Sequence, residues 1–153
     1  MMQHDLNRLT QFEARIQAED ALLSRSPQRL SPRQRLTLLF DQGSFKELFR
    51  FARSHEEAQT FQDGLVCAMG EIHERPVLAY AMEYSYQGGS LGSWQTRQII
   101  ELYRLARQSG LPLIALSESG GARVSDGLHI MEGFAEVMTE SIYCSGVIPQ
   151  VSC

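Results

Sequence analysis

Apolar positions near the start of the chain recur at steps of three and four, the period of an amphipathic helix. A helix over residues 3–24 is therefore expected to pack on the body of the protein or on a partner, through Leu6, Leu9, Phe12, Ile16 and Leu23. A short helix should begin at Pro32, because Ser31 can cap it and proline suits the first helical position. Residues 41–44 end it, and the polar segment 50–63 is expected to be an exposed connection.

From residue 64 onward the apolar density rises and the pattern changes to short runs. Residues 65–72 and 76–82 are separated by three polar residues, a spacing that favours a β-hairpin. A glycine loop, a helix over about 94–108 and a buried strand over 112–116 are expected next. A second glycine loop leads into a last helix, of which one face should be committed to a core through Val124, Leu128, Met131, Ala135, Met138 and Ile142.

Strand, glycine loop and helix thus occur twice, which predicts an α/β architecture with strand-to-helix crossovers. Functional loops are expected at the carboxyl ends of the strands. Residues 147–153 have the pattern of the opening of a buried strand, with no turn chemistry to close it. The sequence is therefore expected to stop inside a structural element and to be a fragment.

The composition is that of an ordinary globular protein, with 153 residues, 43% hydrophobic, 21% charged and a formal charge of -4. No basic run could follow a phosphate backbone, which argues against nucleic-acid binding. No apolar stretch reaches the roughly 18 residues that span a bilayer, and the N-terminus has no signal-peptide pattern, so a cytoplasmic protein without a membrane partner is expected. Cys67, Cys144 and Cys153 lie at no metal-ligand or redox spacing, so we interpret them as reduced thiols and expect no metal site.

Residues 118–124 are the most informative segment, because a buried strand ends in Gly120 and Gly121 and a helix is expected to begin at once. The first N–H groups of a helix have no partner and carry the positive end of its dipole, so this loop suits a developing oxyanion or a carboxylate. The candidate catalytic donors are the backbone amides of Gly120, Gly121 and Ala122. The alternative is a tight turn in which glycine only supplies positive φ.

The two glycine loops carry no obvious nucleophile, general base or metal cluster. Ser119 lacks the glycine two residues before it that a nucleophile elbow requires. Arg123 is expected in the first turn of a helix, where its charge opposes the dipole, so either an ion pair or an anionic substrate group must compensate it. Trp94 and the four histidines are interpreted as packing or surface residues.

Three motifs carry a resemblance to a known family: GGSLG at residues 88–92, SGGAR at 119–123 and SGVIPQ at 145–150. In their order and spacing they resemble the biotin-dependent acyl-CoA carboxyltransferase family, of the propionyl-CoA and methylcrotonyl-CoA carboxylase beta-subunit type. The resemblance covers residues 30–153. These residues would form the front part of an N-terminal carboxyltransferase domain, with residues 1–29 as a separate amphipathic helix.

This resemblance implies a crotonase-like ββα spiral, present here as an incomplete N-terminal part, with the active site between domains of different subunits. In the family's chemistry carboxybiotin releases carbon dioxide, the biotin ureido group accepts the α-proton of the acyl-CoA, and the enolate attacks the carbon dioxide. It further implies biotin on a separate carrier, a coenzyme A thioester as substrate, a biotin carboxylase or biotin carrier subunit as partner, and a homo-oligomer of the full-length chain. The implied substrate-binding residues are Gly88, Gly89, Ser90, Leu91, Gly92, Ser119 and Arg123.

Two departures from the family pattern are present. Gln98, beside Arg97, stands where the family usually has a basic residue, and the glycine-rich segment expected after residue 152 is missing. The 153-residue polypeptide is therefore expected to be inactive and prone to aggregation. Three alternatives stay open: a decarboxylase subunit running the same chemistry in reverse, a crotonase-type hydratase or isomerase using Glu118 or Asp126 as a base, and an inert truncated scaffold. The sequence does not specify the acyl group.

Overall fold

The computed structural model describes residues 29–50 and 64–153, together with residues 7, 10, 11, 13, 14, 17 and 18. Those seven positions near the N-terminus are helical and exposed. The apolar positions of the helix expected over residues 3–24 lie outside the described residues. Residues 51–63, which form most of the expected connection, also lie outside them. The packing of that helix and the nature of that connection therefore stay predictions.

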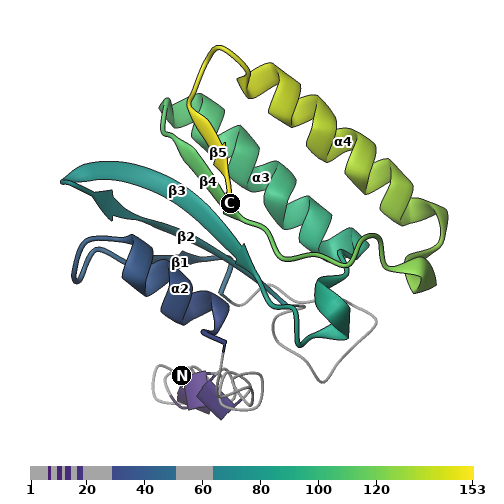
Figure 1. Ribbon diagram of the computed structural model, residues 1–153, viewed down its shortest axis with the longest axis horizontal. Helices are drawn as coiled ribbons and strands as arrows, with labels where there is room; N and C mark the ends of the chain where they lie inside the picture. The colour runs from purple at the N-terminus through teal and green to yellow at the C-terminus, as the bar shows by residue number, and fades with distance from the viewer. Residues whose placement is uncertain (1–6, 8–9, 12, 15–16, 19–28, 51–63) are drawn as a thin grey trace.

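Within the described residues, five strands form one mixed sheet in the order β1-β2-β3-β4-β5 (Figure 1). Their bounds are β1 Lys46–Leu48, β2 Leu65–Ile72, β3 Arg75–Met82, β4 Leu113–Leu116 and β5 Gln150–Ser152. The first three strands pair antiparallel and the last three pair parallel. The predicted hairpin and the two strand-to-helix crossovers are confirmed. β1 was not predicted from the sequence, because three residues are too few to show an alternating pattern.

Helices cover both faces of the sheet (Figure 1). On one face α2 (Pro32–Leu39) packs Leu36 against Val66 and Ala79. On the other face α3 (Ser93–Ser109) packs Ile99 and Leu102 against the sheet. Because successive side chains of a strand point to opposite faces, β2 and β3 contribute to both hydrophobic clusters.

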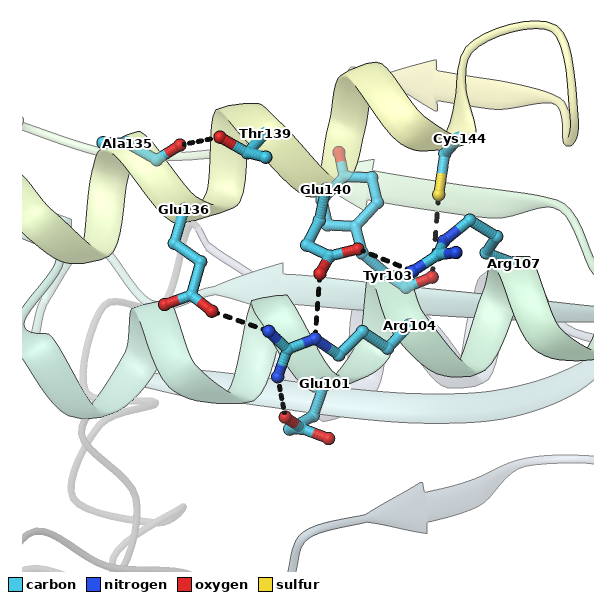
Figure 2. A network of polar contacts seen from close by, with 9 residues as sticks. All are labelled: Glu101, Tyr103, Arg104, Arg107, Ala135, Glu136, Thr139, Glu140 and Cys144. Carbon is cyan, nitrogen blue, oxygen red and sulfur yellow. Dashed lines mark hydrogen bonds and ion pairs between the residues drawn. The ribbon is translucent and has the colours of Figure 1, made fainter.

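The last helix, α4 (Leu128–Cys144), packs mainly on α3. Polar contacts join the C-terminal halves of the two helices (Figure 2). Arg104 of α3 contacts Glu136 at 2.6 Å and Glu140 at 2.9 Å, both from α4, and Glu101 of its own helix at 2.7 Å. Arg107 also contacts Glu140, at 3.2 Å. Glu140 is buried, so these two guanidinium groups neutralise a carboxylate that would be costly to bury alone.

The predicted core face of this last helix is wrong within the described structure. Phe134, Val137 and Cys144 pack with the main core, and Ile130 is also buried, at 2% exposed. The predicted set is exposed: Val124, Leu128, Met131, Ala135, Met138 and Ile142. Both stripes repeat at steps of three and four, so α4 is apolar over more than one face and periodicity does not choose between them. Gly133 favours burial of the observed stripe, because its missing side chain lets α4 approach Thr96 of α3 closely.

The predicted start of that helix is also wrong. A short 3₁₀ turn, η2 (Val124–Asp126), separates the two glycines from α4, and Gly127 is the N-cap of α4. Arg123 precedes η2 with an extended backbone (φ -74, ψ 105). It therefore does not lie in the first turn of an α-helix, and the dipole of α4 begins further along the chain than Gly121.

Candidate functional site

The two glycine loops lie side by side, because each follows one of two neighbouring parallel strands. The first loop, residues 87–92, comes after β3 and contains the short 3₁₀ turn η1 (Gln87–Gly89). The second loop, residues 117–127, comes directly after β4. All the site residues predicted from the sequence lie in these two loops, so the fold brings the two motifs together at the carboxyl ends of the strands.

Backbone hydrogen bonds pair the loops directly. The three bonds run from Gly120 N–H to the Gly88 carbonyl (2.9 Å), from Leu91 N–H to the Gly121 carbonyl (2.9 Å), and from Arg123 N–H to the Leu91 carbonyl (2.8 Å). The last two make a parallel bridge between Leu91 and Ala122. The loops therefore continue the pairing of the sheet beyond the ends of its strands.

This close approach requires glycine at two positions. A Cβ on Gly89 would lie 2.1 Å from the carbonyl oxygen of Glu118, and Gly89 has a φ of +68°. A Cβ on Gly120 would lie 2.7 Å from the carbonyl oxygen of Gly88. Both contacts are with backbone atoms that cannot turn aside, so any larger residue would force the loops apart.

The three backbone amides predicted as donors differ in whether their N–H already has a hydrogen-bond acceptor. The N–H of Gly120 donates to Gly88, and the N–H of Gly121 donates to the Ser119 hydroxyl at 3.1 Å. The N–H of Ala122 has no acceptor among the described residues, because the bridge to Leu91 uses the carbonyl of Gly121 and the N–H of Arg123. Ala122 is exposed, and a Cβ on Gly121 would meet nothing within 4 Å. Of the three predicted donors, Ala122 is thus the one whose N–H has no acceptor among the described residues, and it lies beside open space.

The polar side chains of the second loop are engaged within the fold. The Glu118 carboxylate pairs with Arg29 and lies 3.5 Å from Arg35. Arg123 is 9% exposed, donates to the carbonyl of Ser90 at 3.3 Å and lies over the Tyr86 ring at 5.5 Å. These contacts favour a structural role for Arg123 over direct contact with a substrate.

Asp126 joins the second loop to the start of α3. Its Oδ2 accepts from the N–H of Ser93 at 2.7 Å and from the Ser93 hydroxyl at 2.9 Å. Partial burial acts to raise the pKa of Asp126, but these hydrogen bonds and the charge of Arg123 outweigh it and leave the pKa below its ordinary value. This contact was not predicted from the sequence. The available signal was Gly92, which occupies the N-cap of a 17-residue helix with no side chain to cap it.

Thiols and metal-binding groups add nothing to this site. Cys67 and Cys144 are buried and Cys153 is exposed, and burial raises the pKa of both buried thiols. Across the part of the chain that the structure describes, no cluster of three or more His, Cys, Asp or Glu residues could hold a metal ion. In those same residues no helix has the length and apolar character needed to cross a membrane.

Comparison with known proteins agrees with this geometry. Residues 24–153 match the carboxyl transferase domain family. The chain is 36% identical over 130 residues to the propionyl-CoA carboxylase beta chain of Cereibacter sphaeroides, covering 81% of this chain and 26% of that protein. It is 35% identical over 130 residues to the methylmalonyl-CoA decarboxylase subunit alpha of Veillonella parvula, with the same two coverages.

Among solved structures, transcarboxylase 12S, a hexamer with hydrolysed methylmalonyl-coenzyme A bound, superposes with a TM-score of 0.88 at 28% identity. The match covers 99% of this chain and 32% of that one. The fold is thus the crotonase-like α/β fold of carboxyltransferase domains, present in part. This chain belongs to the carboxyl transferase domain family and spans about a quarter to a third of the length of the relatives that it matches.

Proposed function

We propose that this chain forms part of the carboxyltransferase component of a biotin-dependent acyl-CoA carboxylase. Such a component moves a carboxyl group from carboxybiotin to the α-carbon of an acyl-CoA through an enolate. Membership of the family and likeness to propionyl-CoA carboxylase beta chains support the proposal. The observation that carries it is the N–H of Ala122, which is exposed, lacks an acceptor among the described residues and lies beside two glycines.

In this proposal Ala122 donates its N–H to the thioester oxygen of the acyl-CoA, where negative charge develops as the α-proton leaves. Removing one preorganised donor of this kind typically raises the activation barrier by about 3 to 4 kcal/mol. Gly120 and Gly121 let the thioester approach because they carry no side chain. Their own amides donate to Gly88 and Ser119, so they would stabilise an oxyanion only by giving up those bonds.

The remaining predicted residues would build the support of the amide. Gly88, Gly89, Ser90, Leu91 and Gly92 form the first loop, which pairs with the second, and Ser119 closes the turn before Ala122. Biotin, held on a separate carrier, supplies the carboxyl group and an acceptor for the α-proton. An amide such as that of Ala122 suits a ureido oxygen as well as an enolate oxygen, so in this proposal Ala122 and the open side of Gly121 could also face biotin.

The side chains argue against a hydratase or isomerase. In that alternative Glu118 or Asp126 would have to act as a general base. Both carboxylates are instead engaged, Glu118 with two arginines and Asp126 with Ser93. Chemistry in which this chain provides amides rather than a base agrees better with these contacts.

A decarboxylase subunit is the second candidate, and the 35% identity to a methylmalonyl-CoA decarboxylase subunit favours it as directly as the carboxylases favour the first. Both use the same enolate and the same amide, so the two loops do not set the direction. As partners we propose a biotin carboxylase or biotin carrier subunit and further copies of the native chain, since the relatives named above are subunits of larger assemblies.

The test is an assay of the native-length protein with a biotinylated carrier and a series of short acyl-CoA and carboxyacyl-CoA thioesters. The proposal predicts transfer of the carboxyl group between carrier and thioester, dependent on biotin. Biotin-independent hydration of an enoyl-CoA would instead identify a hydratase. Absence of both reactions would favour the inert scaffold.

A further inference from the structure

The two loops are joined a second time, by side chains, where α3 begins. Asp126, on the second loop, accepts two hydrogen bonds from Ser93, the first residue of α3, across 33 residues of sequence. The first N–H groups of a helix have no acceptor within it, and the N-cap of α3, Gly92, has no side chain to supply one. Asp126 therefore caps a helix to which it does not belong.

Arg123 strengthens the same junction. Its buried guanidinium donates to the carbonyl of Ser90, and its charge attracts the Asp126 carboxylate. A Cβ on Gly92 would lie 2.9 Å from Nη1 of Arg123 and 2.9 Å from Oδ2 of Asp126. Gly92 is thus small because the two charged groups approach the backbone there. We call the contact of Asp126 with Ser93, together with Arg123, the clamp.

The clamp lies next to the exposed amide. The bridge between Leu91 and Ala122 continues on one side into Ser93 and on the other into Asp126. The direction of the Ala122 N–H follows from this bridge, because the Gly121 carbonyl of the same peptide group accepts from Leu91, and the N–H of a trans peptide group points the opposite way. Only two backbone bonds make the bridge, so a side-chain tie beside it restricts how far the second loop can move.

We propose that Asp126 is a positioning residue, which through Ser93 holds the second loop so that the Ala122 N–H keeps the direction needed to stabilise the enolate. The proposal rests on the proposed function, since it assigns the clamp to that amide. Asp126 acts without touching the substrate.

Variants of the native-length protein test this proposal. Asp126→Ala removes the acceptor. Ser93→Pro removes both donors from the other side, and proline is well tolerated at the first position of a helix. Asp41→Ala is the matched control, because Asp41 also accepts a backbone N–H, from Glu74 at 2.8 Å, in a turn at the β2–β3 hairpin. The measurements are hydrogen exchange of the Leu91 and Arg123 amides, which form the bridge, and kcat and KM for the acyl-CoA.

The clamp predicts that Asp126→Ala and Ser93→Pro both speed exchange at Leu91 and Arg123 and lower kcat by about tenfold or more, with a smaller change in KM. The double variant should be no worse than either single one, because both remove the same contact. Asp126→Asn, which keeps an oxygen acceptor, should recover much of kcat, and Asp41→Ala should leave both readouts unchanged.

Unchanged exchange at the two amides in Asp126→Ala or in Ser93→Pro would overturn the proposal, as would a kcat equal to that of the wild type. Hydrogen exchange tests whether the clamp restrains the second loop, and it needs no enzymatic assay. A native protein that transfers no carboxyl group would overturn the proposed function and the kinetic half of this proposal, whatever the exchange shows.

Discussion

The carbonyl oxygen of Gly88 accepts a hydrogen bond from the N–H of Gly120 at 2.9 Å, so the two glycine loops meet backbone to backbone. These residues follow different strands, and only the parallel pairing of β3 and β4 brings them together. The contact explains why each loop needs glycine, and it occupies the N–H of Gly120, whereas the N–H of Ala122, two residues further on, has no acceptor among the described residues.

Alanine at Gly89 should be more damaging than alanine at Gly88. Both glycines have positive φ, so either substitution strains the backbone by about 1 kcal/mol. A Cβ at Gly88 meets nothing within 4 Å, whereas a Cβ at Gly89 would lie 2.1 Å from the Glu118 carbonyl. Gly89→Ala should therefore lower the free energy of unfolding by about 1 to 3 kcal/mol more than Gly88→Ala. Denaturant unfolding of the two variants tests this, and equal losses would mean that the loops are not in contact.

The crossing of α3 and α4 depends on the missing side chain of Gly133. A Cβ there would lie 2.3 Å from Oγ1 of Thr96. Gly133→Ala should thus destabilise the protein by about 1 to 3 kcal/mol even though alanine is the better helix former. The partner variant is Thr96→Ala, which removes the clashing oxygen. Adding it to Gly133→Ala should recover part of the loss in a double-mutant cycle, whereas strictly additive losses would contradict the crossing.

Stability should depend on pH through Glu140. Hydrogen bonds from Arg104, and then from Arg107, hold the pKa of this carboxyl below its ordinary value despite its burial (Figure 2). A carboxyl with a lowered pKa stabilises the fold above its unfolded pKa of about 4.3, and this contribution is lost as the pH falls through the folded pKa. Glu140→Gln should therefore unfold at a lower temperature than the wild type at pH 7, and the difference should shrink below about pH 4.

Glu101→Gln is the matched control for that prediction. Glu101 contacts the same guanidinium but is exposed, so its removal should change the melting temperature little. A difference between wild type and Glu140→Gln that stays constant from pH 7 to acid would show that the carboxylate does not act through its charge.

The two apolar stripes of α4 should respond differently to truncation. Ile130 is 2% exposed and Met131 is 61% exposed. Ile130→Ala should cost about 2 to 4 kcal/mol of unfolding free energy, because it removes buried methyl groups and leaves a cavity, and Met131→Ala should cost less than about 0.5 kcal/mol. Comparable losses would mean that Met131 is covered in the native protein by something other than the described residues.

Much of this fold could be predicted from the sequence, because local signals decide it. Ser31 and Pro32 mark the start of α2, and the Ser31 hydroxyl accepts from the N–H of Gln34 at 3.3 Å. Gly110 ends α3 in the left-handed conformation (φ +69°). Caps and turns of this kind depend on the chemistry of one or two residues, so they can be read without knowledge of the neighbours.

The parts that the sequence did not predict depend on contacts between distant residues. Which stripe of α4 is buried depends on Gly133 meeting Thr96. Which of the three predicted donors keeps an N–H without an acceptor also depends on the folded loops. The sequence does not show that Gly88 accepts from Gly120 and that Ser119 accepts from Gly121. The sequence motif predicted where the site lies. The pairing of Leu91 with Ala122 in the structure then identified Ala122 as the candidate donor.

The central claim is that the N–H of Ala122 stabilises an enolate, and Ala122→Pro tests it directly, because proline has no N–H and no bond of the Leu91 bridge uses that donor. Ala122→Gly, which keeps the N–H, is the control. In the native-length protein, with folding checked by circular dichroism, kcat for carboxyl transfer should fall by about 100-fold or more in Ala122→Pro and only slightly in Ala122→Gly. A folded Ala122→Pro variant with the kcat of Ala122→Gly would contradict the account.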